Sequence, residues 1–228
     1  MGSVRPTHAI AEFEVTALTN GKFKQNCYVV SHGPSKKSLL VDPGSEDAFL
    51  REYLLSHGLE PQKILLTHAH FDHLGAVDPL MKLFGIGCEM HALDKRLVRQ
   101  AATYAYRFGA ASLRVPQGLT FFENELSLDW GGTPVDVLPT PGHTAGSVAF
   151  SIGSAFVFTG DTLFRERIGP TTYPESDRAA IKKSVEKLLS TLPDECIIFP
   201  GHGRPWTIGE ARSWWRLRSE SPAGLAPF

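Results

Sequence analysis

Three histidines and an aspartate fall within six residues of the sequence, at His68, His70, Asp72 and His73. The apolar run at 64–66 comes directly before them, as at the end of a buried strand. Polar side chains in such a place are unfavourable unless a partner satisfies them. Neutral imidazole and carboxylate groups are good ligands for zinc and similar divalent ions. The cluster therefore indicates a metal site.

Three further motifs share this design, in which an apolar run enters a Gly- or Pro-rich loop that carries a ligand-type side chain. Strand ends hold ligands on a rigid scaffold, and glycines let the backbone approach a site closely. Taken alone, each His or Asp in these loops could be an ordinary loop residue, but together the motifs favour one shared site. They are Thr140-Pro141-Gly142-His143-Thr144, Phe158-Thr159-Gly160-Asp161-Thr162 and Phe199-Pro200-Gly201-His202-Gly203.

Hydrophobic patterns predict the elements that must position these loops. Strands fall in two sets with helices in each half, which suggests two sheets packed face to face with helices outside. We expect an α/β (α+β) fold in a single domain over 1–228, with the first strand at an edge and Ser176 or Asp177 as an N-cap. The expected strands are 10–18, 26–30, 38–41, 63–66, 86–90, 119–122, 126–129, 135–138, 147–152, 155–159 and 195–199, and the expected helices are 46–57, 73–84, 94–108, 177–190 and 208–218.

Composition excludes several classes of protein. A hydrophobic fraction of 42% is ordinary for a globular chain, and a net charge of -1 gives no footprint for nucleic acid or an acidic membrane. No apolar run approaches the roughly 20 residues of a spanning helix, and the start lacks a secretory signal. Cys27, Cys88 and Cys196 are odd in number and far apart, which indicates buried reduced thiols. We expect a cytoplasmic protein with a small-molecule substrate, as a monomer or a homodimer.

The order His-x-His-x-Asp-His, Pro-Gly-His-Thr, Gly-Asp-Thr and Gly-His resembles the metallo-β-lactamase-fold hydrolase superfamily, and within it the glyoxalase II-like branch. The resemblance runs from about Asn26 to His202. It implies a four-layer αββα sandwich of two mixed β-sheets flanked by helices. It also implies two divalent metal ions, zinc by default, with iron or manganese compatible with the ligands. One ion would be held by His68, His70 and His143, the other by Asp72, His73 and His202, with Asp161 bridging them.

The resemblance further implies that Asp42 lies behind the site and orients a ligand histidine, with weaker help from Thr67 and Thr144. Alternatively, Asp42 is an ordinary residue of an Asp-Pro-Gly turn. A pair of metal ions lowers the pKa of a shared water, so that a bridging hydroxide can attack a thioester, lactone or other activated ester. Asp72 or Asp161 would take up a proton as the intermediate breaks down. This chemistry requires no Ser or Cys nucleophile.

The substrate is less well defined, because the chain departs from glyoxalase II in two places. Only 26 residues (203–228) follow His202, too few for the helical domain that binds glutathione there. Residues 165–174 also lack that enzyme's Cys-Gly-Lys-Phe and Gly-Arg-Thr-Asp patterns, so glutathione recognition is only weakly implied. We expect 92–118 to form a lid. Candidate substrate contacts are Arg165, Arg167, Tyr173 and Tyr104, and Arg107 and Arg114 would make the pocket partly cationic. Alternatively, 164–175 is a solvated surface loop. The aromatic residues Tyr104, Tyr106 and Phe108 could instead serve helix packing.

Three other functions compete with this hydrolase. A mononuclear iron persulfide dioxygenase often uses fewer ligands, and the presence of both His73 and His202 argues against it. A β-lactamase is disfavoured by the absence of a secretion signal and by Asp161. A binding or pathway protein that retains its metals is compatible with every motif.

Overall fold

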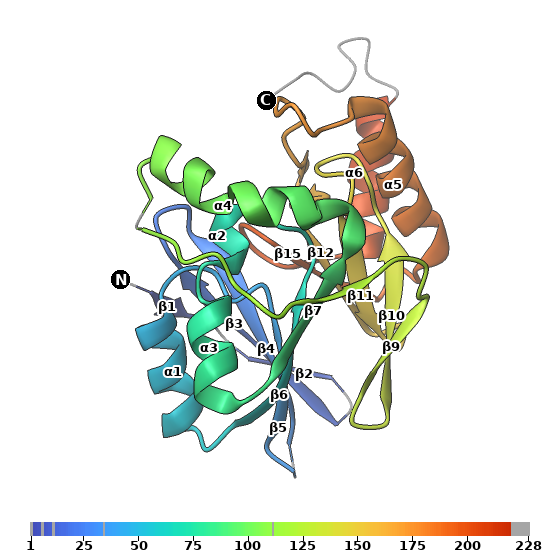
Figure 1. Cartoon of the computed structure of the whole chain (residues 1–228). Coiled ribbons are helices and arrows are strands. Elements are labelled where there is room, and N and C mark those ends of the chain that lie inside the picture. Colours follow the sequence, from blue (N-terminus) through green and yellow to red (C-terminus); the bar gives the residue numbers. More distant parts are fainter. Residues whose placement is uncertain (1, 6, 11, 34, 111, 220–228) are drawn as a thin grey trace.

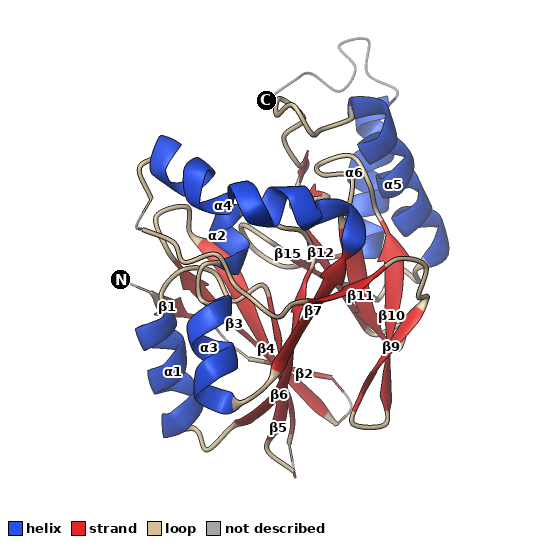
Figure 2. Cartoon of the chain, viewed as in Figure 1, coloured by secondary structure: helices blue, strands red, loops and turns tan. Residues whose placement is uncertain are grey.

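The computed structural model describes residues 2–5, 7–10, 12–33, 35–110 and 112–219. Two β-sheets pack face to face, and helices cover the outer face of each (Figure 1). Colouring by secondary structure makes the order helix, sheet, sheet, helix visible across the molecule (Figure 2). The predicted αββα sandwich is therefore confirmed. Within the described ranges, no helix is long and apolar enough to cross a membrane.

The first sheet combines antiparallel and parallel strands. Its order is β1-β3-β4-β5-β6-β7-β8, with β2 also paired to β3, and the strands from β5 to β8 run parallel. Helices α1, α3 and α4 pack beside it. The elements of this half are β1 Ser3–Val4, β2 His8–Ile10, β3 Phe13–Asn20, β4 Gln25–His32, β5 Lys37–Val41, α1 Asp47–Ser56, β6 Glu60–Leu66, α2 Phe71–Leu74, α3 Val77–Phe84, β7 Gly87–His91, the 3-10 turn η1 Ala92–Asp94, α4 Lys95–Arg107 and β8 Thr120–Phe122.

The second sheet has the order β16-β15-β12-β11-β10-β9, and only its β12–β15 pair is parallel among the described strands. Helices α5 and α6 cover its outer face (Figure 1). A separate hairpin of β13 and β14 follows β12. The elements are β9 Ser127–Trp130, β10 Thr133–Pro139, β11 Val148–Ile152, β12 Phe156–Gly160, β13 Leu163–Phe164, β14 Arg167–Ile168, α5 Arg178–Thr191, β15 Ile197–Pro200, β16 Trp206–Thr207 and α6 Ile208–Ser219.

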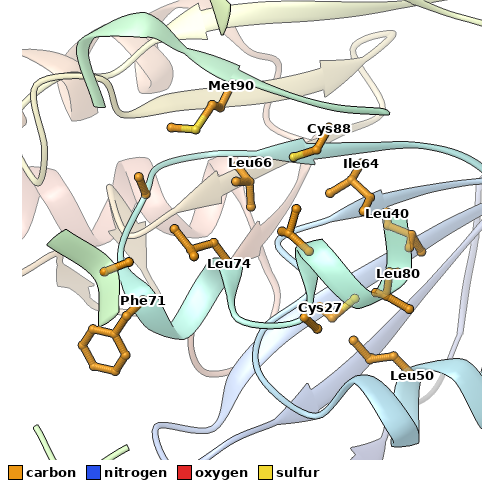
Figure 3. Close-up of a cluster of buried hydrophobic side chains, with 14 of the residues drawn as sticks. Cys27, Leu40, Leu50, Ile64, Leu66, Phe71, Leu74, Leu80, Cys88 and Met90 are labelled. Carbon is orange, nitrogen blue, oxygen red and sulfur yellow. The ribbon is translucent and has the colours of Figure 1, made fainter. Parts of the chain in front are cut away.

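Successive side chains along a strand pack into two different layers of the hydrophobic core. Leu65 joins the core between the two sheets, whereas its neighbours Ile64 and Leu66 face the helices outside the first sheet. Figure 3 shows this outer cluster, in which strand residues such as Ile64 face Leu50 of α1 and Leu80 of α3. Each fully buried aliphatic side chain contributes about 1.5–3 kcal/mol. Side chains on both faces thus fix strand β6 up to its last residue, Leu66, which is two positions before His68.

The structure corrects two sequence-based predictions about the first half of the chain. The predicted helix at 73–84 is two helices, α2 and α3, because the loop after β5 intrudes there: Gly44 N donates to His73 O at 2.9 Å and Ala76 N donates to Gly44 O. The predicted edge strand at 10–18 lies inside the sheet, because β1 and β2 cover it; both are too short to show a pattern.

The other predicted elements are present with small shifts at their ends. The predicted N-cap Asp177 is confirmed, since its Oδ1 accepts hydrogen bonds from Ala179 N at 2.8 Å and Ala180 N at 2.9 Å. Helix α6 is the last described element, and residues 220–228 of the segment after His202 lie outside the described residues.

Candidate metal centre

The seven predicted ligand residues converge from both sheets onto one place. His68 and His70 lie in the loop after β6, while Asp72 and His73 belong to α2. The other three come from the β10–β11 loop and from the residues that follow β12 and β15. The structure forms two groups whose ligand atoms all lie within 4.8 Å of one another: His68, His70 and His143, and Asp72, His73 and His202.

Asp161 lies between these two groups. Its Oδ2 is 3.6 Å from His143 Nε2 and 3.5 Å from His202 Nε2. Its Oδ1 is 3.4 Å from His73 Nε2. The carboxylate therefore faces both groups at once, as a bridging ligand must.

Each of the five histidines uses one ring nitrogen to bind an acceptor outside the cluster. Because these partners accept hydrogen bonds, the outer nitrogen carries the proton and the other nitrogen of the neutral ring presents its lone pair to the cluster. For His68 the acceptor is Thr67 Oγ1, whose own proton goes to Asp42 Oδ2 at 2.6 Å. The five contacts are His68 Nδ1 to Thr67 Oγ1 (3.1 Å), His70 Nε2 to Glu175 Oε1 (3.0 Å), His73 Nδ1 to Asp42 Oδ2 (3.0 Å), His143 Nδ1 to Pro170 O (2.8 Å) and His202 Nδ1 to Phe23 O (3.0 Å).

Three inner atoms of the cluster lack hydrogen-bond partners within the described part of the chain. His68 Nε2, His73 Nε2 and Asp161 Oδ1 are buried without any hydrogen bond. His70 Nδ1 and His143 Nε2 lie 2.8 Å apart, and the tautomers given above leave a lone pair on each. Two facing lone pairs repel unless a cation lies against them, and buried acceptors without a donor are unfavourable. The arrangement therefore fits bound metal ions.

Burial and charge divide the cluster into a neutral half and a charged half. Burial, together with the neighbouring imidazoles, lowers the pKa of His143 to about 4 and lowers that of His68 well below its ordinary value. Burial also opposes the charge of His73, yet the carboxylates of Asp161, Asp42 and Asp72 raise its pKa. Burial would raise the pKa of Asp161, but His202 and His73 lower it well below its usual range. His68 and His143 thus offer neutral imidazoles, and the carboxylate of Asp161 is ionised.

Asp42 supports the cluster from behind. Its backbone φ is 51°, in the left-handed region that Asp tolerates better than most residues, and its side chain is buried. Oδ1 accepts from Thr67 N at 2.8 Å, and Oδ2 accepts from both Thr67 Oγ1 and His73 Nδ1. Asp42 could form a ligand group with His68 and His73. Since three donors already occupy its oxygens, we interpret it as an orienting residue, as the sequence predicted.

Comparison with known proteins agrees with this geometry. Residues 20–202 match the model of the metallo-beta-lactamase superfamily. The chain belongs to the metallo-β-lactamase superfamily. The hydroxyacylglutathione hydrolase GloC of Haemophilus influenzae is 36% identical over 205 residues, covering 87% of this chain and 95% of GloC.

Two solved structures are also similar to this chain. The B3 metallo-beta-lactamase BLEG-1 is 33% identical with a TM-score of 0.81, covering 86% of this chain and 95% of BLEG-1. TTHA1623, solved in a di-iron-bound form, is 37% identical with a TM-score of 0.77, covering 86% of this chain and 96% of TTHA1623. The sequence-based assignment to the superfamily is thus confirmed.

Asp94 is a site residue of this superfamily member that sequence reasoning missed. Asp94 is 1% exposed. Because Asp94 directly precedes α4, its sequence position is typical of a helix N-cap, but its carboxylate makes no capping hydrogen bond. Its Oδ2 accepts from Ala69 N at 3.0 Å and from Thr144 Oγ1 at 2.8 Å, and its Oδ1 accepts from Gly146 N at 2.8 Å. Asp94 thus joins the loop of His68 and His70 to the loop of His143. Thr144 acts through Asp94 and not directly on a histidine.

A cavity of about 350 Å³ opens onto the candidate ligand cluster and includes the predicted contacts Tyr104, Arg167 and Tyr173. Arg165 does not line it, which corrects that prediction: its guanidinium pairs with Glu210 of α6 at 3.1 Å. Glu175, another residue that sequence reasoning missed, lies beside the cavity, where it binds His70 and accepts from Tyr104 Oη at 3.4 Å.

Of the predicted lid at 92–118, helix α4 lies across the end of the first sheet (Figure 1). Tyr104 of α4 and Phe108, which follows it, line the cavity. Those two residues are therefore not merely packing residues. Residue 111 lies outside the described residues. Leu113 and Val115 pack on the first sheet's outer core, and Arg114 between them is exposed. Arg114 Nη1 lies 3.8 Å from Asp78 Oδ2, and Arg114 does not line the cavity. Arg107 is exposed and does not line the cavity either.

Proposed function

We propose that the protein is a dinuclear metal-dependent hydrolase that cleaves a thioester, lactone or other activated ester. The observation that carries the proposal is the set of five histidines whose inner ring nitrogens gather around Asp161, while their outer nitrogens bind acceptors. The similarity to GloC, named as a hydroxyacylglutathione hydrolase, supports ester or thioester chemistry.

His68, His70 and His143 would hold one metal ion, and Asp72, His73 and His202 the other. When bound, such a pair of ions acidifies a shared water and polarises the carbonyl group of the substrate. Zinc is the default choice for these nitrogen and oxygen ligands, and the di-iron form of TTHA1623 makes iron the first alternative to test.

Two carboxylates of the chain are suited to handle the proton released in the reaction. Asp161 is ionised and lies between the two ligand groups. The side chain of Asp72 is 15% exposed, borders the cavity, and has Oδ2 3.3 Å from His202 Nε2. We assign proton uptake to an Asp72 oxygen, because that carboxylate is the more accessible of the two to a leaving group. Asp161 holds the two ligand groups in register.

The test combines metal analysis with a substrate panel. Purified protein loaded with zinc, or separately with iron, is assayed against S-lactoylglutathione, acyl-homoserine lactones, aryl esters and neutral thioesters. We expect hydrolysis of at least one class and its loss, together with the metal, in His68→Ala. The matched control is His57→Ala, an exposed histidine at the end of α1. Full activity in His68→Ala would overturn the site assignment.

The competing functions give different results in the same test. Nitrocefin belongs in the panel, because BLEG-1 is named a B3 metallo-beta-lactamase. Opening of nitrocefin with no ester hydrolysis would overturn the proposal in favour of a β-lactamase. One iron per chain with oxygen uptake on a persulfide would favour the dioxygenase. Two bound metal ions with no turnover of any substrate would favour a binding protein.

A further inference from the structure

Aromatic side chains from five separate segments form the wall of the cavity. Phe23 comes from the turn between β3 and β4, Phe71 from the start of α2, and Phe108 from the residue that follows α4. Phe164 of β13 and Tyr173 of the loop before α5 complete the wall. Ring centroids lie 5.3 Å apart for Phe23 and Phe71, 5.8 Å for Phe71 and Phe108, and 6.3 Å for Phe108 and Tyr173. Phe23, Phe71, Phe108 and Tyr173 thus form one continuous row of rings, and Phe164 lines the cavity separately, with its ring centroid 5.8 Å from that of His202.

This aromatic wall is not fully used by the packing of the protein. Phe23 and Phe108 are each 37% exposed. Figure 3 shows the ring of Phe71 at the margin of the hydrophobic cluster, directed away from Leu50 and Leu80. Aromatic rings grouped around an open cavity expose apolar area that a ligand can remove from water. The cavity volume of about 350 Å³ lies within the range of small-molecule sites, so an apolar group the size of one ring fits within it.

Positive charge is scarce on this wall. Arg167 is the one Lys or Arg side chain among the described residues that line the cavity, and its guanidinium lies 4.8 Å from the centre of the Phe164 ring. Lys22 lies near the rim, but its ammonium donates to the backbone carbonyls of Phe108 and Gly109 at 2.9 and 3.2 Å. A glutathione group carries two carboxylates and one ammonium, and such a group would find few partners here. Burying it without partners would be unfavourable.

We propose that the substrate has an uncharged, apolar group, about the size of a phenylacetyl group, beside the bond that is cleaved. This inference rests on the proposed esterase or thioesterase function and specifies its substrate class. The aromatic wall would bind the apolar group, and metal ions held by the histidines and aspartates at one side of the cavity would polarise the carbonyl. A peptide-like group with several charges, such as glutathione, is disfavoured.

The experiment compares matched thioesters on the metal-loaded protein. Phenylacetyl and acetyl thioesters of N-acetylcysteamine share one leaving group and differ only in the apolar acyl part, and S-lactoylglutathione represents the charged class. We expect kcat/KM to be at least about tenfold higher for the phenylacetyl than for the acetyl thioester, because the ring buries apolar surface. We also expect the phenylacetyl thioester to exceed S-lactoylglutathione.

Substitutions identify the wall as the source of the preference. Phe108→Ala, and independently Phe23→Ala, should reduce the phenylacetyl-to-acetyl ratio by about threefold or more. The matched control is Tyr106→Ala, whose side chain is on the same α4 as the cavity residue Tyr104 but 87% exposed and outside the cavity. It should leave the ratio and the rates unchanged. A higher rate on S-lactoylglutathione, or equal rates on the two neutral thioesters, would overturn this inference while leaving the hydrolase proposal intact. No hydrolysis of any of the three would instead count against the hydrolase proposal itself.

Discussion

His70 Nδ1 lies 2.8 Å from His143 Nε2, and the two residues come from loops that follow strands of different sheets. His70 follows β6 of the first sheet, and His143 follows β10 of the second. The remaining ring nitrogens are held by Glu175 Oε1 and Pro170 O. A metal ion bound by both histidines would therefore link the two halves of the sandwich.

Metal removal should destabilise the protein for this reason. Chelation leaves the lone pairs of His70 and His143 facing each other without a cation, so we expect the Tm to fall and zinc to restore it. Binding at a hundredfold excess over Kd adds about 2.7 kcal/mol per site to the free energy of unfolding. Thermal unfolding with and without chelator measures this change. The link between the sheets would be contradicted if chelation left the Tm of the wild type unchanged and if that Tm equalled the Tm of His143→Ala.

Asp94→Asn should weaken metal binding although Asp94 lies outside the proposed ligand set. An amide keeps one acceptor oxygen but replaces the other by a donor, which cannot satisfy Gly146 N and Thr144 Oγ1 together with Ala69 N. We expect about 10- to 100-fold weaker metal affinity and a loss of about 1–3 kcal/mol in the free energy of unfolding. Competition with a chromophoric chelator and denaturant unfolding measure the two effects. The control is Asp136→Asn on the exposed face of β10; equal affinities in both variants would refute the role of Asp94.

Gly201→Ala should damage the site while leaving the fold in place. A Cβ at this position would overlap Asp161 Oδ1 and come within 2.8 Å of His73 Cε1. A displacement of about 1 Å at a catalytic centre can reduce the rate by about 100-fold. We expect fewer than two metal ions per chain and at least about tenfold slower hydrolysis, with an unchanged circular dichroism spectrum. Gly87→Ala in β7, where a Cβ meets nothing within 4 Å, is the control and should behave as wild type.

The three cysteines should react slowly with Ellman's reagent in the native protein. All are fully buried, and burial raises the pKa of Cys196 to about 11 and those of Cys27 and Cys88 as well. Little thiolate is then present at neutral pH. We expect three thiols per chain to react only after denaturation. Fast labelling of Cys27 in the native state would contradict this expectation and would make Cys27 a candidate thiol nucleophile.

The ligand residues could be predicted from the sequence because each follows an apolar run and sits in a short Gly- or Pro-rich motif. These motifs are local, and the ends of neighbouring parallel strands such as β12 and β15 bring them together. The role of Asp42 could be predicted from the family resemblance, because Asp42 directly follows β5 in an Asp-Pro-Gly motif.

Other site residues act through contacts that no local pattern reveals. Asp94 is 25 residues from Ala69 and 50 from Thr144, and only the packing of η1 beside both loops brings its carboxylate to them. The aromatic wall is likewise assembled from single residues of separate segments. Arg165 was misplaced because a loop sequence does not show that its guanidinium turns to Glu210 on α6.

Metal stoichiometry tests the central claim most directly. Metal-free protein is titrated with zinc by calorimetry, and the bound metal is counted by mass spectrometry after gel filtration. We predict two ions per chain for the wild type, and fewer than two for His68→Ala and for His202→Ala, which each remove a ligand from a different group. One ion or none in the wild type, or two ions in both variants, would contradict the dinuclear centre.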